Sequence, residues 1–437
     1  MKKSNRYGSF ARRSVRGVTI ALTMAMVVMT GCGSSDAVSE EPKPVVDPVV
    51  PVVTPTTLEL TRSEKVMVTE SNAFAFNLFK VATAMVGPKS MILSPISITY
   101  ALGMLNNGAA GATQEQINKV LGFGETGADS INAFCYKMLQ MAPQQDPQTK
   151  VMIANTIYMN KGYELLPTFV EKARAFYAAE PETRDFADGR TMDVINRWAS
   201  DHTEQMIDKV LDEDSFNPVA VSYLLNAIYF KGTWTKTFDK ALTMKEKFDR
   251  RGIDGKGVPV EMMHQTSAFD YGETSTCQVL RLPYGNCSYQ MTILLPKNGD
   301  SALPQVPTAE EWDQLSRKMS SREVDVKLPR FESKTDMGLV PLMMKLGMTD
   351  AFNRDLADFR YFCNEPTFIS LMKQVAKIKL DEEGTEAAAV TVIGLEKATA
   401  VGPEPQPIAF HASHPFLYVI SERQTGAVFF IGSYVGE

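Results

Sequence analysis

Residues 381–392 read Asp-Glu-Glu-Gly-Thr-Glu-Ala-Ala-Ala-Val-Thr-Val, a run of acidic, small and β-branched side chains that contains no proline. The run follows residues 373–380 (KQVAKIKL), which alternate between an apolar and a lysine-rich face as a half-buried strand does. If the run is extended, alternate small residues from Thr385 to Ala389 point to one side and Glu386 points to the other. The small side chains could then enter a narrow gap between strands while the glutamate stays in water.

The chain after this run has a different composition. Gly394 is followed by a polar stretch, and residues 402–407 read Gly-Pro-Glu-Pro-Gln-Pro. The three prolines prevent continued strand pairing because they lack a backbone N–H. Connections beyond about 15 residues without regular structure are uncommon unless they are functional. We therefore predict an exposed loop whose first half can become a strand; the alternative is an ordinary long connection.

Helical patterns dominate the part of the chain before this loop, and strand patterns follow them. Apolar residues recur at helical spacing after Ser71, and Ser94-Pro95 is a helix-start signal in which the serine could cap the first turn. Strand-like runs rich in β-branched and aromatic residues occupy positions 223–230, 289–296, 373–380, 416–420 and 427–435. Regular β-α-β alternation does not occur, so the sequence predicts an α+β fold.

The first 31 residues predict an export signal. They carry six basic and no acidic side chains, with an apolar run at positions 18–29. A membrane-spanning helix needs about 20 apolar residues, so the run predicts a signal rather than an anchor. Positions 29–32 read MTGC, which resembles the lipobox of bacterial lipoproteins, where the cysteine is lipidated. We expect lipidation at Cys32; the alternative is a plain secretory signal with an incidental cysteine.

Removal of residues 1–31 changes the charge of the chain. The sequence has 45 basic and 51 acidic residues, a net charge of −6; without the six basic residues of the signal it has 39 and 51, a net charge of −12. An acidic chain without a basic stripe predicts no nucleic-acid partner. Residues 32–60 are rich in proline and valine and predict a semi-rigid tether. We expect the tether to hold a folded part, residues 61–437, away from a membrane.

Local signatures of catalysis are absent from the sequence. It contains no GxSxG elbow, no HExxH pair and no GxxxxGK[ST] loop. His411 and His414 could bind a metal in principle, but they adjoin a strand start and are better explained as packed or surface histidines. Cys277 and Cys287 lie several residues apart along a hairpin, too far for a disulfide. We therefore predict no enzyme activity, no cofactor and no metal site.

Five ordered motifs resemble those of one family. The run at 381–392 closely resembles the hinge and reactive-centre loop of the serpins. The other motifs similar to serpin motifs are 94–98 (SPISI) with 105–111 (LNNGAAG), 226–234 (NAIYFKGTW), 327–331 (KLPRF) and 410–416 (FHASHPF). The resemblance spans about residues 64–436.

This resemblance implies a serpin fold and a mechanism. The fold is a single domain, residues 61–437, with three β-sheets (A, B and C), eight to nine helices and an exposed reactive-centre loop at about residues 382–409. In the family, a serine protease cuts the loop and forms an acyl-enzyme, after which the freed hinge inserts as a new strand into the central sheet. The resemblance therefore implies a single-use inhibitor and a 1:1 covalent complex. We expect the free chain to be a monomer.

The family motifs also imply roles for individual residues. The hinge comprises Glu382, Gly384, Thr385, Glu386, Ala387, Ala388 and Ala389. The shutter and breach, where the central strands part, comprise Ser94, Ser97, Asn226, Trp234, Arg330 and Gln374. Gln374 stands where the family often has histidine, which predicts a neutral network with less sensitivity to pH. Arg330 is expected to pair with Glu382.

The register of the loop suggests the protease class. Taking Glu382 as the seventeenth residue before the cut places the scissile bond at Ala398-Thr399, and a register one residue shorter places it at Lys397-Ala398. Alanine suits elastase-like proteases and lysine suits trypsin-like ones. Papain-like cysteine proteases are a further class of target.

Two further expectations concern the cellular location and an alternative function. The signal and the lipidation site predict a protein of the bacterial cell envelope, anchored by lipid to the outer membrane on its periplasmic or surface face, or released outside the cell. The alternative function is that of a non-inhibitory serpin, acting as a binding, carrier or chaperone-like protein. The small hinge residues favour inhibition, because a bulky residue at Thr385 or Ala387 would obstruct insertion.

Overall fold

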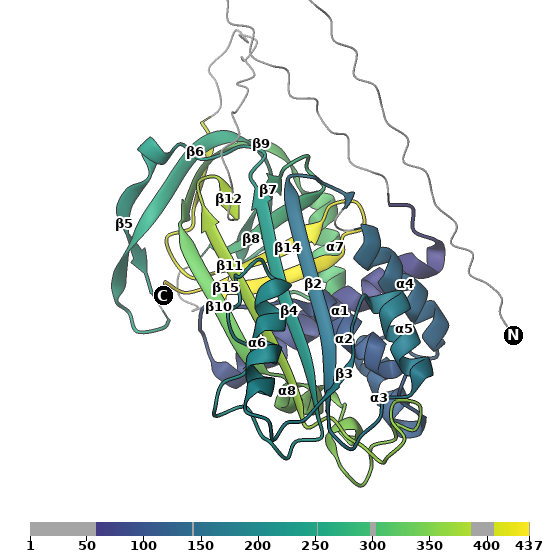
Figure 1. Ribbon diagram of the computed structural model, residues 1–437. Coiled ribbons are helices and arrows are strands. Elements are labelled where there is room, and N and C mark those ends of the chain that lie inside the picture. The colour runs from purple at the N-terminus through teal and green to yellow at the C-terminus, as the bar shows by residue number, and fades with distance from the viewer. Residues whose placement is uncertain (1–57, 142–143, 251, 298–302, 386–405, 437) are drawn as a thin grey trace, which may run out of the picture. The chain divides into compact units, whose positions relative to one another are not determined.

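The structure is a computed structural model that describes residues 58–141, 144–250, 252–297, 303–385 and 406–436 (Figure 1). The chain divides into two compact units; Met1–Pro51 lies outside the described residues, and those described belong to the second unit, Val52–Glu437. The expected signal, Cys32 and most of the tether therefore lie outside the described residues. Within the described ranges, no helix is both long and apolar enough to cross a membrane.

Eight α-helices lie in the described residues: α1 (Arg62–Val86), α2 (Pro95–Asn106), α3 (Gly111–Leu121), α4 (Ala128–Met141), α5 (Pro167–Tyr177), α6 (Arg190–Asp201), α7 (Ala309–Lys318) and α8 (Val340–Leu346). Helix α1 begins earlier than its apolar pattern predicts, because Thr61 and Glu64 form a capping box. Helix α2 begins at Pro95 as predicted. The predicted cap is wrong, because the Ser94 hydroxyl instead donates to the carbonyl oxygen of Phe429 at 2.8 Å.

The strands are β1 (Met91–Leu93), β2 (Thr149–Asn160), β3 (Glu182–Arg184), β4 (Ser222–Thr233), β5 (Met244–Asp249), β6 (Gly257–Glu273), β7 (Cys277–Tyr284), β8 (Tyr289–Pro296), β9 (Ser320–Pro329), β10 (Phe331–Gly338), β11 (Leu371–Asp381), β12 (Gly384–Thr385), β13 (Ile408–His411), β14 (Phe416–Glu422) and β15 (Val428–Tyr434). Each of the five strand-like runs predicted from sequence coincides with one of them. The α+β prediction is confirmed, since helices dominate the part before β4 and strands the part from β4 onward.

The central sheet has six strands in the order β10-β11-β12-β4-β2-β3. Strand β11 pairs directly with β4, in parallel, from Leu371 to Lys377. Beyond that point the two strands diverge, and β12 lies between them (Figure 1). The sheet is therefore closed over most of the length of β4 and opened by one added strand at a single end.

The second sheet has nine strands, along the path β1-β15-β14-β8-β7-β6-β9-β13 with β5 paired to β6. Strand β6 pairs with β5 and β9 along most of its length and with β7 through its last residues. The sheets expected as B and C are both present, and they share β6 in one continuous hydrogen-bonded path. This arrangement agrees with the expected serpin fold.

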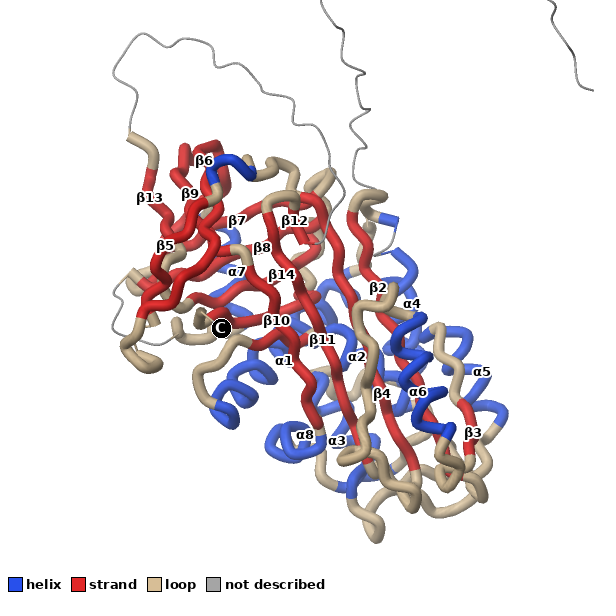
Figure 2. The backbone as a smooth tube through the Cα atoms, turned by 60° about the vertical axis from the view of Figure 1, so that its left-hand side comes forward, coloured by secondary structure: helices blue, strands red, loops and turns tan. Residues whose placement is uncertain are grey.

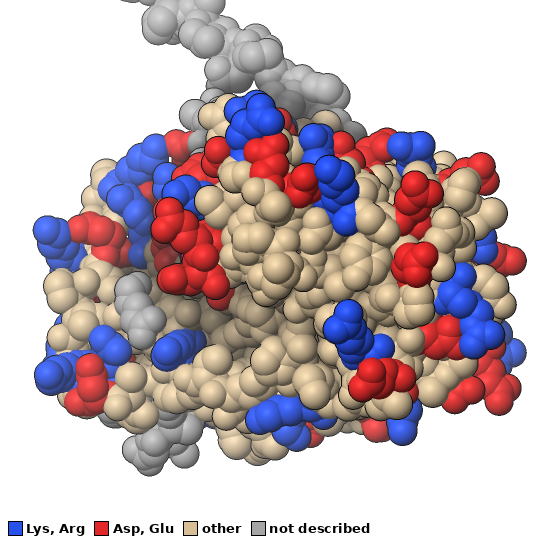
Figure 3. All heavy atoms as spheres, turned by 60° about the horizontal axis from the view of Figure 1, so that its bottom comes forward, with Lys and Arg blue, Asp and Glu red and all other residues tan. Residues whose placement is uncertain are grey.

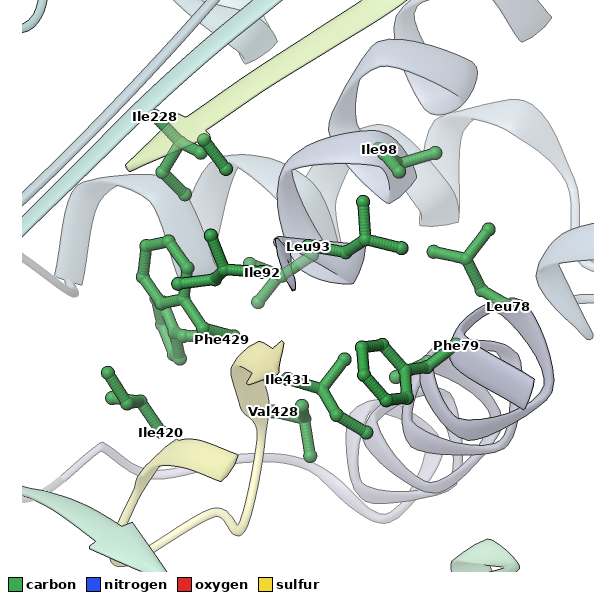
Figure 4. Close-up of a cluster of buried hydrophobic side chains, with 14 of the residues drawn as sticks. Leu78, Phe79, Ile92, Leu93, Ile98, Ile228, Ile420, Val428, Phe429 and Ile431 are labelled. Atoms are coloured by element: carbon green, nitrogen blue, oxygen red, sulfur yellow. The ribbon is translucent and has the colours of Figure 1, made fainter. Parts of the chain in front are cut away.

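The main core fills the space between the two sheets. Every residue of α2 is buried, and the helix contacts β2, β4 and β15. Figure 4 shows apolar side chains from α1, β1, α2, β4, β14 and β15 converging on this region. Burial of apolar surface on this scale is the main stabilising contribution to the fold. A helix that is buried on all sides, as α2 is, is stable only when other elements surround it.

Helix α6 covers the opposite face of the central sheet (Figure 2). Its buried residues Ile195 and Ala199 belong to a second apolar cluster with Tyr223 of β4 and Val375 of β11. One apolar cluster therefore joins this helix with residues of both strands that part at the far end.

Candidate functional site: the hinge and the central strands

The hinge begins at a tight turn after β11. The chain reverses at Glu382 and returns as β12, which is antiparallel to both of its neighbours. In this register Thr385 lies between Leu380 of β11 and Gly232 of β4. The first two residues of β12 are therefore already a strand of the central sheet.

Gly384 is required by the geometry of this turn. Its φ is +143°, a conformation that side chains disfavour. A Cβ atom at this position would lie 2.1 Å from the carbonyl oxygen of Gly232 and 2.7 Å from the Cα of Thr233. Backbone atoms cannot move aside as a flexible side chain can. Only glycine fits where the hinge meets β4.

Thr385 is held by a side-chain hydrogen bond. It is completely buried, and its hydroxyl lies 2.9 Å from the hydroxyl of Tyr284, which is also completely buried. The Tyr284 ring stacks on Trp234 with 4.3 Å between centroids and 11° between planes. The breach therefore consists of two stacked aromatic rings that support the inserted end of the hinge.

The backbone of the hinge turn is bound by the segment after β4. The backbone N–H of Trp234 donates to the carbonyl oxygen of Glu383 at 2.8 Å, and its indole N–H donates to that of Asp381 at 3.0 Å. The N–H of Phe238 donates to the carbonyl oxygen of Glu382 at 2.8 Å. Three successive carbonyls, those of residues 381–383, are thus satisfied by one short segment, which fixes the course of the turn.

The Glu382 carboxylate anchors the turn. Its side chain is 1% exposed and accepts hydrogen bonds from Arg330, as expected, and from the Thr243 hydroxyl at 2.6 Å. Burial alone would raise the pKa of Glu382, but these hydrogen bonds outweigh it and lower the pKa below its usual value. Glu383 is paired on the outside of the turn by Lys240.

The shutter is a row of neutral amides across three strands. Gln374 of β11 lies opposite Asn226 of β4, which lies opposite Asn155 of β2. The Gln374 amide donates to the Asn226 side-chain oxygen at 2.7 Å, and the Asn226 amide donates to that of Asn155 at 2.6 Å. The row contains no titratable group, in agreement with the neutral network predicted from Gln374.

The start of α2 closes this row from the side of the core. Gln374 donates to the carbonyl oxygen of Ser94 and accepts from its backbone N–H, each at 3.0 Å. Asn226 donates to the carbonyl oxygen of Ser97 at 3.3 Å, and the Ser97 hydroxyl lies 3.5 Å from the Gln374 amide. The network therefore ties β11 and β4 to one another and to the start of α2.

A family model described as "Serpin (serine protease inhibitor)" matches residues 69–436 of the sequence. The chain belongs to the serpin family. Human Serpin B8 is 33% identical over 375 residues, which cover 83% of this chain and 97% of the relative. A protease-inhibitor type of function follows from the family.

Solved serpin structures agree with the fold. Native tengpin, a thermophilic serpin, superposes with a TM-score of 0.77 at 27% identity, covering 88% of this chain and 97% of tengpin. Human thyroxine-binding globulin in complex with its ligand superposes with a TM-score of 0.77 at 25% identity, covering 85% and 98%. The family therefore contains a hormone-binding member with the same fold.

The structure brings together most of the serpin site residues predicted from sequence. Glu382, Gly384, Thr385, Trp234 and Arg330 meet at the breach, and the remaining shutter residues meet at the middle of the β4–β11 pair. The predicted residues that lie outside the described ranges are Glu386, Ala387, Ala388 and Ala389 of the hinge, and Lys397, Ala398 and Thr399 at the candidate bonds.

Three contacting residues were missed by sequence reasoning. Tyr284 is visible in sequence as part of a hairpin turn signal, but its position under the hinge depends on the packing of the two sheets. Thr243 and Asn155 have no local signal, because their partners lie on other strands. Their hydrogen bonds to Glu382 and Asn226 are long-range contacts.

The described part of the chain contains neither a metal-binding cluster nor a disulfide. Within those residues, no group of three or more His, Cys, Asp or Glu side chains could hold a metal ion. The cysteines at 135, 277, 287 and 363 are free thiols, and Cys277 lies opposite Pro296 at the far end of the hairpin from Cys287. The face in Figure 3 carries basic and acidic side chains interspersed.

Proposed function

We propose that this serpin is a suicide-substrate inhibitor of serine proteases. A target protease cuts the loop that follows β12, forms an acyl-enzyme, and is trapped when the freed hinge inserts between β4 and β11. Papain-like cysteine proteases are a further class of target in this proposal. The supporting observation is that Gly384 and Thr385 already pair with both strands, so the sheet accepts the start of the hinge without rearrangement.

The energetics of strand addition favour insertion. Parting β4 from β11 breaks one parallel ladder, from Leu371 to Lys377, whereas a strand inserted between them forms two ladders. The residues from Thr385 to Ala398 number 14 and extend about 46 Å at ~3.3 Å each. At roughly 1 kcal/mol net for each added backbone hydrogen bond, and with burial of side chains on both faces, insertion gains on the order of 10 kcal/mol.

The chemical steps belong to the protease. The hydroxyl oxygen of its catalytic serine attacks the carbonyl carbon of residue 398, and the protease histidine takes the serine proton. The bond to the nitrogen of residue 399 then breaks, and the histidine gives that proton to the leaving amine. Hydrolysis of the remaining ester would restore the protease, so inhibition requires insertion to be faster than attack by water.

The proposed bond is Ala398-Thr399, with Lys397-Ala398 as the alternative. Alanine before the bond fits the small pocket of an elastase-like protease, and lysine fits the acidic pocket of a trypsin-like one. Use of both bonds is consistent with the two residues being adjacent. The protease that reacts therefore reports which bond is used.

Complex formation tests the proposal. The purified chain is mixed with trypsin and, separately, with elastase, and we expect a 1:1 complex that survives boiling in SDS. Mass spectrometry of the released C-terminal peptide identifies the bond. Absence of a complex with any protease, together with no gain in thermal stability after loop cleavage, would contradict the inhibitory function.

A hinge variant provides the control. Thr385→Arg puts a long charged side chain where the residue is completely buried between strands. We expect this variant to be cleaved at the same bond but to form no complex, because insertion stops at its first step. Thr385→Ser, which keeps the hydroxyl, should retain complex formation.

A binding function is the second candidate, favoured by the likeness to thyroxine-binding globulin. A carrier that does not inhibit would be cleaved in the loop without forming a complex. The complex assay therefore separates the two functions, provided that Thr385→Arg and the unmodified chain are compared in parallel.

We also propose that the chain is held on the bacterial envelope by lipid at Cys32, with the proline-rich segment as spacer and release outside the cell as the alternative. Incorporation of a labelled fatty acid into the chain tests this. Cys32→Ser should abolish the label and move the protein from the membrane fraction to the soluble fraction. An unlabelled wild-type chain would contradict the anchor.

A further inference from the structure

The strand after the loop is weakly held by its backbone. β13 has four residues, Ile408–His411, and lies at the end of the nine-stranded path. In the described part of the chain it pairs only with β9, in parallel, from Ile408 opposite Val324 to His411 opposite Lys327. A short edge strand with one partner depends on side-chain contacts to stay in the sheet.

One carboxylate links this strand to two others. The Asp325 side chain of β9 has one oxygen 2.9 Å from Nε2 of His411 on β13 and the other 2.5 Å from Nε2 of His264 on β6. The hydroxyl of Thr266 on β6 donates to Asp325 at 3.2 Å. Three neighbouring strands are thus joined through a single acidic side chain.

The nearest basic side chain on β9 is paired elsewhere, so the side-chain partners of Asp325 on the neighbouring strands include two imidazoles. Lys327, on the same face of β9, is paired with Glu246 of β5 at 2.6 Å. Glu323 lies on that face two residues to the other side. Burial alone would raise the pKa of Asp325, but the hydrogen bonds from the histidines outweigh it and lower the pKa. The carboxylate is therefore charged at neutral pH and accepts from both rings.

The length of the loop determines whether the uncleaved chain can insert while β13 stays in its sheet. β12 and β13 both lie in the upper part of Figure 2, at the two ends of residues 386–407. If the chain from Thr385 to Ala398 inserted fully, its end would lie about 46 Å along the sheet. The nine residues between Ala398 and Ile408 make ten Cα–Cα steps, which span at most about 36 Å. Full insertion without cleavage therefore requires β13 to leave β9.

We propose that His411, Asp325 and His264 form a latch that keeps β13 in the sheet and so prevents the uncleaved loop from inserting. His411 connects the strand to the carboxylate, and His264 holds the carboxylate in position from the other side. The latch rests on the proposed function in one respect, since insertion of the loop is the event it controls.

The test follows spontaneous conversion of the uncleaved chain. Wild type and His411→Ala are incubated at a temperature below their melting temperatures. Conversion is read as a monomer on a native gel with a raised melting temperature and a loop resistant to added protease. Loss of a charge-assisted hydrogen bond at a partly exposed site predicts conversion about tenfold faster. No target enters the measurement, so it stays informative even if the chain inhibits no protease.

Lys327→Ala is the matched control. It removes from the same face of β9 an ion pair of similar exposure whose partner, Glu246, lies on β5, and it leaves unchanged the backbone of residue 327, which pairs with β13. We expect conversion within about twofold of wild type, the scale of a surface pair. Equal acceleration by Lys327→Ala and His411→Ala would overturn the latch.

A double-mutant cycle identifies the partner. If His411 acts through Asp325, then His411→Ala should change the conversion rate little in the background of Asp325→Ala. Independent effects of the two substitutions on the rate would multiply. Multiplying effects, or conversion of His411→Ala at the wild-type rate, would refute the latch. Should His411→Ala fail to fold, His264→Ala takes its place: it leaves β13 untouched and should still speed conversion, and a wild-type rate for that variant would refute the latch equally.

Discussion

The hydroxyl groups of Thr385 and Tyr284 lie 2.9 Å apart with no access to water. Their residues are far apart in the sequence, and the bond joins the central sheet to the nine-stranded sheet. The hinge is therefore not a free end of the loop. Its first turn is fixed by a defined set of contacts, and each contact makes a separate prediction.

Tyr284→Phe should loosen the hinge. The substitution keeps the ring that stacks on Trp234 and removes only the hydroxyl, which leaves the Thr385 hydroxyl buried without its partner. We expect the free energy of unfolding to fall by about 1–3 kcal/mol. Urea denaturation measures this. Tyr100→Phe is the control, since that buried hydroxyl has no partner among the described residues and its loss should cost little.

Gly384→Ala should expel β12 from the sheet. The new methyl group would overlap the carbonyl oxygen of Gly232, and relieving such a clash costs about 1–3 kcal/mol. A lower melting temperature and earlier cleavage of the hinge by a non-specific protease are expected. Gly338→Ala, where no atom lies within 4 Å of the added carbon, should change neither. Equal effects of the two substitutions would argue against the tight fit.

Arg330→Ala should shorten the life of the native monomer. It leaves Glu382 buried with only the Thr243 hydroxyl as side-chain donor, and the loss is about 1–3 kcal/mol after allowance for the exposure of the arginine. On mild heating we expect faster spontaneous insertion or polymerisation, measured by native gel. Arg317→Ala, which breaks a surface pair with Asp313, serves as control. An unchanged monomer lifetime would show that the Arg330 pair is unimportant.

The same pair predicts how stability depends on pH. The pKa of Glu382 is lower in the folded chain than in the unfolded one, so its contribution is complete above the unfolded value of about 4.3 and is lost as the pH falls through the folded value. The stability gap between wild type and Arg330→Ala should therefore be constant near neutral pH and shrink in acid. Urea unfolding of both chains across this range tests the sign, and a gap that widens in acid would contradict it.

Gln374→His should make the shutter sensitive to pH. Gln374 is completely buried among neutral groups, where a charged imidazole is disfavoured, so the pKa of the new histidine should fall below its unfolded value of about 6.5. Stability is then lost as the pH drops below the unfolded value. Melting temperatures at several pH values should diverge from wild type on the acid side only. A constant difference would mean that the histidine stays neutral or reaches solvent.

Local patterns were sufficient to predict much of this molecule. The run at 289–296 coincides with β8, and the strand before the hinge was identified from its alternating faces. Pro95 marked the start of α2. Each of these depends on neighbours in sequence, where periodicity and backbone chemistry act directly.

Contacts between distant elements could not be predicted in this way. The hydroxyl of Ser94 was expected to cap a helix, yet it bonds to β15, because the packing of α2 against that strand offers it a buried carbonyl acceptor. Asn155 and Tyr284 acquire their roles from the register of β2 and the stacking of two sheets. Such roles are determined by the whole fold and leave no mark in a short stretch of sequence.

The position of helix α6 has a consequence for strand insertion. Its buried residues share an apolar cluster with residues of β4 and β11, and a strand placed between those two strands would move them about 4.8 Å further apart. In the proposed mechanism, the apolar cluster that joins the helix to both strands would have to rearrange once in each reaction, which would slow insertion. In that mechanism, water could free the protease for as long as the rearrangement lasts. Substitution of Ile195 or Ala199 by a smaller residue would therefore shorten the lifetime of the native state and speed the proposed insertion.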